Sequence, residues 1–152
     1  MKFVIQRVSK ASVSIEGRIA GEIQKGFLVL IGIVHEDTQE DADILVKKMT
    51  GLRIFEDENG KTNLSLADVD GSLLLVSQFT LYANCRKGNR PSFTDAAPPD
   101  LAIELYRYII EACRQKVENV QTGEFGAEMK IELCNEGPFT VLLDSRELKS
   151  KS

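Results

Sequence analysis

Two strand-like segments with apolar centres, residues 27–34 and 72–79, most constrain what this 152-residue chain can fold into. A short run of Val, Ile, Leu and Phe, bounded by glycine or polar residues, is typical of a strand buried on both faces. Both segments are much shorter than the roughly 20 apolar residues that a membrane-spanning helix needs. A sheet that contains such strands must therefore be covered on both sides by other parts of the chain.

Further strands are indicated where β-branched residues cluster or alternate with polar ones. These segments are residues 2–8, 11–15, 18–24, 61–66, 128–134 and 138–144. Only two helices are indicated, one from a capping box at Thr38 to about Gly51 and one opening at Pro98-Pro99. Two helices cannot cover both faces of so many strands. We therefore predict a single α/β domain of three layers over residues 1–152: two largely antiparallel, barrel-like β-sheets, two helices packed on one sheet, and a polar, frayed tail from about residue 146.

Composition excludes several classes of function. The hydrophobic and charged fractions, 43% and 28%, are ordinary for a soluble protein, and the start of the chain turns polar too soon for a signal peptide, so we expect a cytoplasmic protein without a membrane partner. The net charge of −4 argues against general binding of duplex nucleic acid, but not against contact with one end of an RNA. With a single histidine, His35, and no P-loop, dinucleotide fingerprint or zinc spacing, we expect no metal site and no cofactor.

The three cysteines, Cys85, Cys113 and Cys134, are far apart and include no C-x-x-C pair. In a cytosolic chain this pattern predicts free thiols that pack as small hydrophobic side chains. The alternative is a catalytic Cys85, whose pKa the neighbouring Arg86 and Lys87 would lower. No base is evident beside it.

Two short motifs contain residues that are unusual for the strands in which they occur. Residues 77–81, Ser-Gln-Phe-Thr-Leu, add three hydrogen-bonding side chains to the end of an apolar strand. Residues 135–140, Asn-Glu-Gly-Pro-Phe-Thr, place Gly137-Pro138 between two strand-like segments, where proline removes a donor from the ladder. Positions that contradict their local structure tend to be functional.

The chemistry of these motifs does not suggest a conventional catalytic triad. Ser77 and Thr80 are possible nucleophiles, but a hydroxyl must have a base within hydrogen-bond reach to be activated. His35 follows a predicted strand and is more simply interpreted as a surface residue. A basic run, Arg86, Lys87 and Arg90, is either a phosphate contact or a solvated loop.

The motifs together resemble those of the D-aminoacyl-tRNA deacylase family, from Met1 to about Leu143. The resemblance rests on the order and separation of these two core motifs and of five further segments. The five are residues 5–8 (Ile-Gln-Arg-Val), 11–13 (Ala-Ser-Val), 26–30 (Gly-Phe-Leu-Val-Leu), 88–93 (Gly-Asn-Arg-Pro-Ser-Phe) and 121–123 (Gln-Thr-Gly). The one departure is Glu136, where aspartate is expected.

The resemblance implies a homodimeric enzyme that hydrolyses the ester joining a D-amino acid, or a mischarged glycine, to the 3′ end of tRNA. In the family the bond between Gly137 and Pro138 is cis, and this dipeptide reaches into the pocket of the other subunit. Its carbonyl groups hold the α-amino group of the substrate and leave no room for an L side chain, which amounts to chiral proofreading. Asn135 and Arg7 are implied as supporting residues of this substrate-binding loop.

The resemblance also assigns roles to the first motif. Ser77 and Gln78 would hold the terminal adenosine, and the backbone N–H of Phe79 or Thr80 would stabilise the oxyanion. The 2′-hydroxyl of the substrate would assist the attacking water, while Thr80 as the nucleophile is the rival mechanism. Arg86, Lys87 and Arg90 are expected to contact the tRNA.

Two other classes of function remain open. One is a non-catalytic nucleic-acid-binding protein that uses the basic run, and it predicts binding with a steep salt dependence and no turnover. The other is a hydrolase of small esters or amides that uses Thr80 or Cys85, and it predicts activity without any adenosine.

Overall fold

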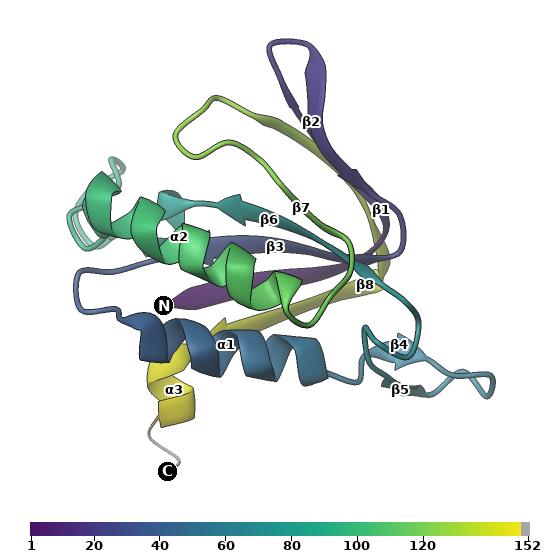
Figure 1. Cartoon of the computed structure of the whole chain (residues 1–152). Coiled ribbons are helices and arrows are strands. Elements are labelled where there is room, and N and C mark those ends of the chain that lie inside the picture. Colours follow the sequence, from purple (N-terminus) through teal and green to yellow (C-terminus); the bar gives the residue numbers. More distant parts are fainter. Residues whose placement is uncertain (150–152) are drawn as a thin grey trace.

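One strongly curved sheet of six strands forms the frame of the protein (Figure 1), for which a computed structural model describes residues 1–149. Its strands follow the order β2-β1-β3-β6-β7, and β8 pairs with the other edge of β1. Their bounds are Lys2–Ile15 (β1), Arg18–Ile23 (β2), Gly26–Gly32 (β3), Ser72–Ser77 (β6), Val120–Thr122 (β7) and Lys130–Asp144 (β8). A second, small sheet pairs β4 (Phe55–Glu56) with β5 (Thr62–Leu64).

The pairing of β1 with three neighbours bends the sheet into a nearly closed, barrel-like shape. The first half of β1 pairs with β3, its second half pairs with β2, and β8 runs antiparallel to nearly its whole length. Only β3-β6 and β6-β7 are parallel pairs. The predicted α/β domain with largely antiparallel, barrel-like sheets is therefore confirmed, with one sheet much larger than the other.

Helices α1 (Gln39–Gly51) and α2 (Pro99–Arg114) pack on one face of the large sheet (Figure 1). The apolar run of β3 contains no polar face because its alternate residues pack into two different hydrophobic clusters. Phe27, Val29 and Ile31 join the core beneath the helices, while Leu28 joins a second cluster on the opposite face. Because successive side chains of a strand point to opposite faces, both clusters need apolar residues. The prediction that this segment is buried on both faces is confirmed.

The start of α1 agrees with the sequence. The Asp41 carboxylate accepts a hydrogen bond of 2.9 Å from the backbone N–H of Thr38, as the carboxylate of a capping box does. Helix α2 has Pro99 in its first turn, where the missing N–H has no partner to lose.

Three parts of the predicted strand pattern are wrong. Residues 2–8 and 11–15 belong to one continuous strand, because β8 pairs along both halves and bridges the polar residues between them through two irregularities of register. The segments 128–134 and 138–144 also form one strand, β8, interrupted only by a bulge. Strand β7 was not foreseen, because three residues are too few to show a period.

The tail that was expected to fray from residue 146 begins instead with helix α3, Ser145–Lys149. Ser145 is fully buried, and its hydroxyl donates a hydrogen bond to the Asp41 carboxylate at 2.8 Å. The ammonium group of Met1 donates to the same hydroxyl at 3.0 Å. Partners far away in the sequence therefore hold this segment, and residues 150–152 lie outside the described residues.

Candidate active site

The first motif lies where strand β6 ends and turns into a one-turn 3₁₀-helix, η1 (Phe79–Tyr82). The backbone N–H of Gln78 donates to the Ile31 carbonyl at 2.8 Å, so the chain leaves the sheet directly after this residue. The Gln78 side-chain amide donates to the Thr80 hydroxyl at 2.5 Å. Because the first N–H groups of a helical turn have no partner within the turn, Phe79 and Thr80 present backbone donors at this point.

A pocket of about 640 Å³ opens beside this turn. Ser77, Gln78 and Phe79 form its polar end, and Phe93, Phe125 and Met129 are among the side chains of its apolar walls. The Phe79 ring is 57% exposed, although it is a large apolar side chain, and it meets Phe93 edge-on with 5.2 Å between ring centroids. An exposed aromatic ring beside hydrogen-bonding groups is suited to stack on a flat, polar ligand such as a nucleobase.

The second motif forms the bulge in β8. Gln6 pairs with Thr140 and Val8 pairs with Asn135, so residues 136–139 face Arg7 alone. The Asn135 side chain closes the bulge, because its carbonyl oxygen accepts the N–H of Phe139 at 2.8 Å and its amide donates to Thr140 at 3.1 Å. The bond between Gly137 and Pro138 is cis, as the resemblance implies, and both residues are exposed.

Arg7 supports this bulge from below, as expected. Its side chain is buried, donates from Nε to the Glu136 carbonyl at 3.0 Å and from Nη1 to the Ile54 carbonyl at 2.7 Å, and stacks on the Phe139 ring at 4.7 Å. Gly137 has a φ of +134°, and a Cβ atom there would lie 2.9 Å from Nη2 of Arg7. Glycine is therefore required both by the backbone conformation and by this close approach.

The two motifs do not share a pocket within one chain. Gly137, with Arg7 and Phe55, lines a separate pocket of about 370 Å³, whereas residues 77–79 line the larger one. Within the described residues of a single chain, the two motifs therefore lie in different pockets.

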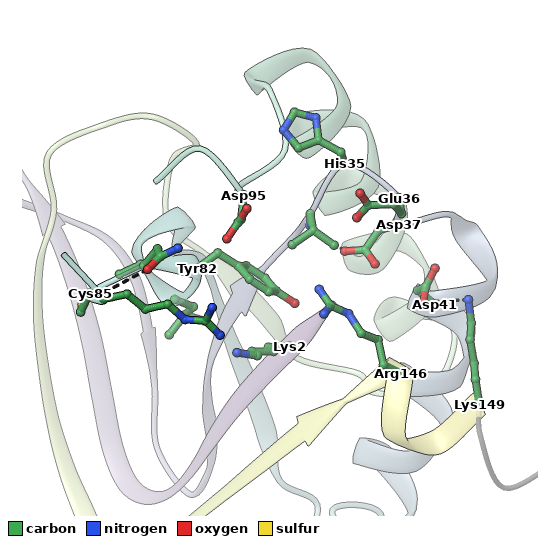
Figure 2. A pocket seen from close by; sticks show the side chains of 15 residues that line it. Lys2, His35, Glu36, Asp37, Asp41, Tyr82, Cys85, Asp95, Arg146 and Lys149 are labelled. Carbon is green, nitrogen blue, oxygen red and sulfur yellow. Dashed lines mark hydrogen bonds and ion pairs between the residues drawn. The ribbon is translucent and has the colours of Figure 1, made fainter. Parts of the chain in front are cut away.

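The other candidate residues lie elsewhere. His35 is exposed, with Nε2 at 3.2 Å from the Thr94 carbonyl, and it lines a third pocket together with Cys85 and Arg86 (Figure 2). Among the described residues, neither the Ser77 nor the Thr80 hydroxyl has a hydrogen bond to His35, and a triad is not formed. Lys87 and Arg90 are exposed in the loop that follows η1.

The cysteines are free thiols, but the prediction that all three pack as small hydrophobic residues is wrong for two of them. Cys113 lies on the buried face of α2, and burial raises the pKa of its thiol to about 12. Cys85 in the loop after η1 and Cys134 on β8 are exposed. Cys85 has Asp95 and His35 in its pocket, and it does not line the pocket of residues 77–79.

Two other kinds of feature are absent from residues 1–149. No three His, Cys, Asp or Glu side chains in this range are grouped so that they could hold a metal ion. No helix in the same range has the length and hydrophobicity required to cross a membrane.

Some residues that form the site could not be predicted from the sequence. The pocket walls Phe125 and Met129 come from a segment without a clear period, and the Ile54 carbonyl that anchors Arg7 is a backbone group with no signature in the sequence. Phe93 belongs to the motif at residues 88–93, but no role was predicted for it. A phenylalanine that follows a basic run in an otherwise polar loop could have indicated a functional side chain.

Known proteins share much of this sequence. The family model described as D-Tyr-tRNA(Tyr) deacylase matches residues 4–144. D-aminoacyl-tRNA deacylases of Fusobacterium nucleatum and Clostridium novyi are 56% and 54% identical to the chain, over 99% and 97% of its length and 100% and 99% of theirs.

Solved structures give the same fold. The c-Myc DNA unwinding element binding protein is 41% identical and superposes with a TM-score of 0.89 over 95% of this chain and 98% of its own. A probable eukaryotic D-amino acid tRNA deacylase, 18% identical, has the same fold with a TM-score of 0.82 over 94% and 98%.

A strand-end turn with free backbone donors, beside an apolar pocket and without a metal cluster in residues 1–149, fits the hydrolases, and the chain is an enzyme of this class. It belongs to the D-Tyr-tRNA(Tyr) deacylase family.

Proposed function

We propose that the enzyme hydrolyses the ester bond of D-aminoacyl-tRNA and releases the free D-amino acid and tRNA. The observation that carries the proposal is the turn at residues 78–80, whose backbone donors lie at the polar end of the 640 Å³ pocket. In this arrangement the terminal adenosine stacks near Phe79 and is held by Ser77 and Gln78. The N–H of Phe79 or Thr80 stabilises the oxyanion, a role typically worth about 10²–10³ in rate.

The reaction does not need an activated protein nucleophile. An aminoacyl ester is reactive, and the ribose carries a 2′-hydroxyl next to the ester that assists the attacking water. Within residues 1–149, no hydrogen bond joins His35 to the hydroxyl of Ser77 or Thr80, which supports this mechanism over a Thr80 nucleophile, because a neutral hydroxyl without a base is a poor nucleophile. The Thr80 side chain, bonded to Gln78, then helps to position this amide.

Chiral selection is assigned to Gly137 and Pro138 of a second copy of the chain. Within one chain the dipeptide is exposed on its bulge and lines a pocket other than that of Phe79. In a homodimer the bulge of each copy reaches the pocket of its partner, where its carbonyl groups bind the α-amino group. An L side chain meets the rigid backbone, whereas a D side chain points away, and glycine, which has no side chain, is also accepted.

The free side of β8 supports the homodimer. Among the described residues, the 15-residue strand pairs only with β1, and its outer surface exposes Leu142 and Leu133 at 69% and 38%. A long edge strand with exposed apolar side chains is a template for pairing with another chain. Arg86, Lys87 and Arg90 contact the tRNA on the other side of η1.

The direct test is hydrolysis of D-Tyr-tRNA and L-Tyr-tRNA by the purified protein. We expect rapid loss of the D ester only, at a rate that falls about 100-fold or more when the tRNA ends in 2′-deoxyadenosine. A Thr80→Ala variant should keep turnover within about tenfold of the wild type. Undiminished hydrolysis of the deoxy substrate would rule out 2′-hydroxyl assistance, and complete loss in Thr80→Ala would restore the nucleophile mechanism.

A non-catalytic nucleic-acid-binding protein is the second candidate function. It is suggested by the name of the 41% identical structure, the c-Myc DNA unwinding element binding protein. This candidate predicts salt-sensitive binding of RNA or DNA with no loss of either ester. The same hydrolysis assay separates the two, because a folded protein that leaves both esters intact contradicts the deacylase proposal.

A further inference from the structure

The third pocket, of about 910 Å³, lies on the opposite side of η1 from the pocket of Ser77 and Phe79. Phe79 begins the 3₁₀-helix and lines the catalytic pocket, whereas Leu81 and Tyr82 end it and line the third pocket. The two pockets are therefore separated by a single helical turn. A ligand with an extended backbone can pass from one to the other around this turn.

Tyr82 has an unmatched polar group in this pocket. The residue is only 7% exposed, and its hydroxyl has no hydrogen-bond partner among residues 1–149. Burial, followed by the nearby charges of Asp37 and Asp144, raises the pKa of this hydroxyl, so it is a protonated donor at neutral pH. Because buried polar groups are nearly always satisfied, an isolated donor beside a pocket calls for a ligand that accepts.

Three cations surround this donor. The Lys2 Nζ atom lies 4.8 Å and the Arg146 Cζ atom 6.0 Å from the centre of the Tyr82 ring, and Arg86 lines the same pocket. Figure 2 shows Tyr82 between Lys2 and Arg146, with its hydroxyl end toward Arg146. No described carboxylate forms an ion pair within 4.0 Å with any of these three side chains.

The carboxylates of the pocket are largely compensated. Asp37 accepts from the Met1 ammonium group at 2.9 Å, and Asp41 pairs with Lys149 at 2.9 Å. Glu36 and Asp95 lie at the side of the pocket near His35 (Figure 2). The side around Tyr82 therefore presents Lys2, Arg86 and Arg146 against Asp144, whose carboxylate accepts the backbone N–H of Arg146 at 2.9 Å, and this excess of donors suits a phosphate group.

We propose that Tyr82, Lys2 and Arg146 bind a backbone phosphate of the RNA strand that leads into the catalytic pocket. The inference rests on the proposed function, because that function brings the 3′ end of a tRNA to Phe79. It extends the contact beyond Arg86, Lys87 and Arg90 and makes the third pocket a determinant of how the RNA is held. The site positions the substrate and takes no part in ester cleavage.

The test compares two substrates that differ only in RNA length: D-Tyr-tRNA and 3′-(D-tyrosyl)adenosine, which lacks every backbone phosphate. In Tyr82→Phe we expect the KM for tRNA to rise about three- to tenfold with kcat unchanged, and in the double variant Lys2→Gln/Arg146→Gln about tenfold or more. The dependence of log KM on log salt should weaken by about 0.7 in the double variant, as for one lost single-strand phosphate contact. Hydrolysis of the adenosine ester should be unchanged in both.

Lys47→Gln, which removes one exposed charge from α1, serves as the matched control and should leave both substrates unaffected. Equal losses on both substrates would assign Tyr82 a structural role and overturn the proposal, as would unchanged kinetics on tRNA. A melting temperature that inorganic phosphate raises in the wild type but not in Tyr82→Phe, with an unaltered KM for tRNA, would reassign the site to free phosphate. If the wild type hydrolyses neither substrate, the proposed function itself fails.

Discussion

Arg7 connects the Gly137-Pro138 bulge to the rest of the chain through two carbonyl groups that belong to different parts of the fold. Its guanidinium bonds the Glu136 carbonyl on the bulge and the Ile54 carbonyl before β4. Planar geometry allows one arginine to hold both acceptors at fixed directions, which lysine cannot do. The rigidity of the proposed chiral filter therefore depends on a residue 129 positions away from the bulge in sequence.

Replacement of Arg7 should be costly because it removes a buried side chain and leaves two partly buried carbonyl acceptors unpaired. We expect Arg7→Ala to lower the free energy of unfolding by about 2–4 kcal/mol and to reduce discrimination against L-Tyr-tRNA. Urea denaturation and the two-ester assay measure these effects. Arg53→Ala, which removes an exposed arginine bonded to Asn63, is the control and should cost under about 1 kcal/mol. Comparable losses in the two variants would contradict the role given to Arg7.

A substitution at Gly137 tests whether the bulge requires the backbone conformation of glycine. Alanine there must adopt a φ of +134° and approach Arg7, so Gly137→Ala should destabilise the protein by about 1–3 kcal/mol and impair D-ester hydrolysis. Gly51→Ala at the end of α1 is the matched control, because a Cβ atom there meets nothing within 4 Å. Thermal unfolding of the pair is the measurement, and a neutral Gly137→Ala would show that the bulge can relax.

At the scale of elements, helix α3 is attached to α1 through one carboxylate. Asp41 accepts the Ser145 hydroxyl at 2.8 Å, the Thr38 N–H at 2.9 Å and the Lys149 ammonium at 2.9 Å. Burial alone would raise the pKa of Asp41, but these hydrogen bonds, that from Lys149 foremost, outweigh it and lower the pKa to about 2. The carboxylate thus stabilises the folded state only while it is ionised.

This lowered pKa predicts a pH dependence of stability. The folded pKa of about 2 lies below the usual value of 3.8, so the contribution is complete above about pH 4 and is lost as the pH falls toward 2. On acidification the wild type should lose the stabilisation, roughly 1–2 kcal/mol, that the ionised Asp41 carboxylate provides. Asp41→Asn has no such carboxylate to protonate, so we expect its free energy of unfolding to fall by that much less. Urea unfolding at pH 5 and pH 3 checks the difference, and parallel pH profiles for both proteins would refute it.

For the whole molecule, the two motifs line different pockets of one chain, and in the proposed homodimer they meet across the interface. The free edge of β8 and the exposed Leu142 are the surface on which we expect this assembly. We therefore expect chiral selection to depend on the dimer.

A charge on this surface should separate the subunits. We expect the wild type to sediment as a dimer and Leu142→Glu to sediment as a monomer whose turnover of D-Tyr-tRNA falls about 100-fold or more. The control is Ile19→Glu, which alters an equally exposed apolar residue, at 61%, in the β1-β2 hairpin. An active monomeric Leu142→Glu would show that the partner's Gly137-Pro138 is not needed.

Most elements could be predicted because their signals are local. The apolar run of β3, the capping box of α1 and the proline that opens α2 each depend on residues within one or two turns of each other. The predictions are wrong where a residue far away in the sequence determines the local structure. Residues 9–10 look like a break until β8 pairs across them, and the polar tail looks frayed until Asp41 and Met1 hold Ser145.

The sequence by itself determined the class of fold, the two motifs and the family, because periodicity and short motifs are encoded by neighbouring residues. The tertiary structure was needed to show that the Ile54 carbonyl anchors Arg7 and that, within residues 1–149, Tyr82 has an unpaired hydroxyl beside Lys2 and Arg146. Those facts depend on the curvature of one sheet, which brings residues together that no spacing along the chain relates.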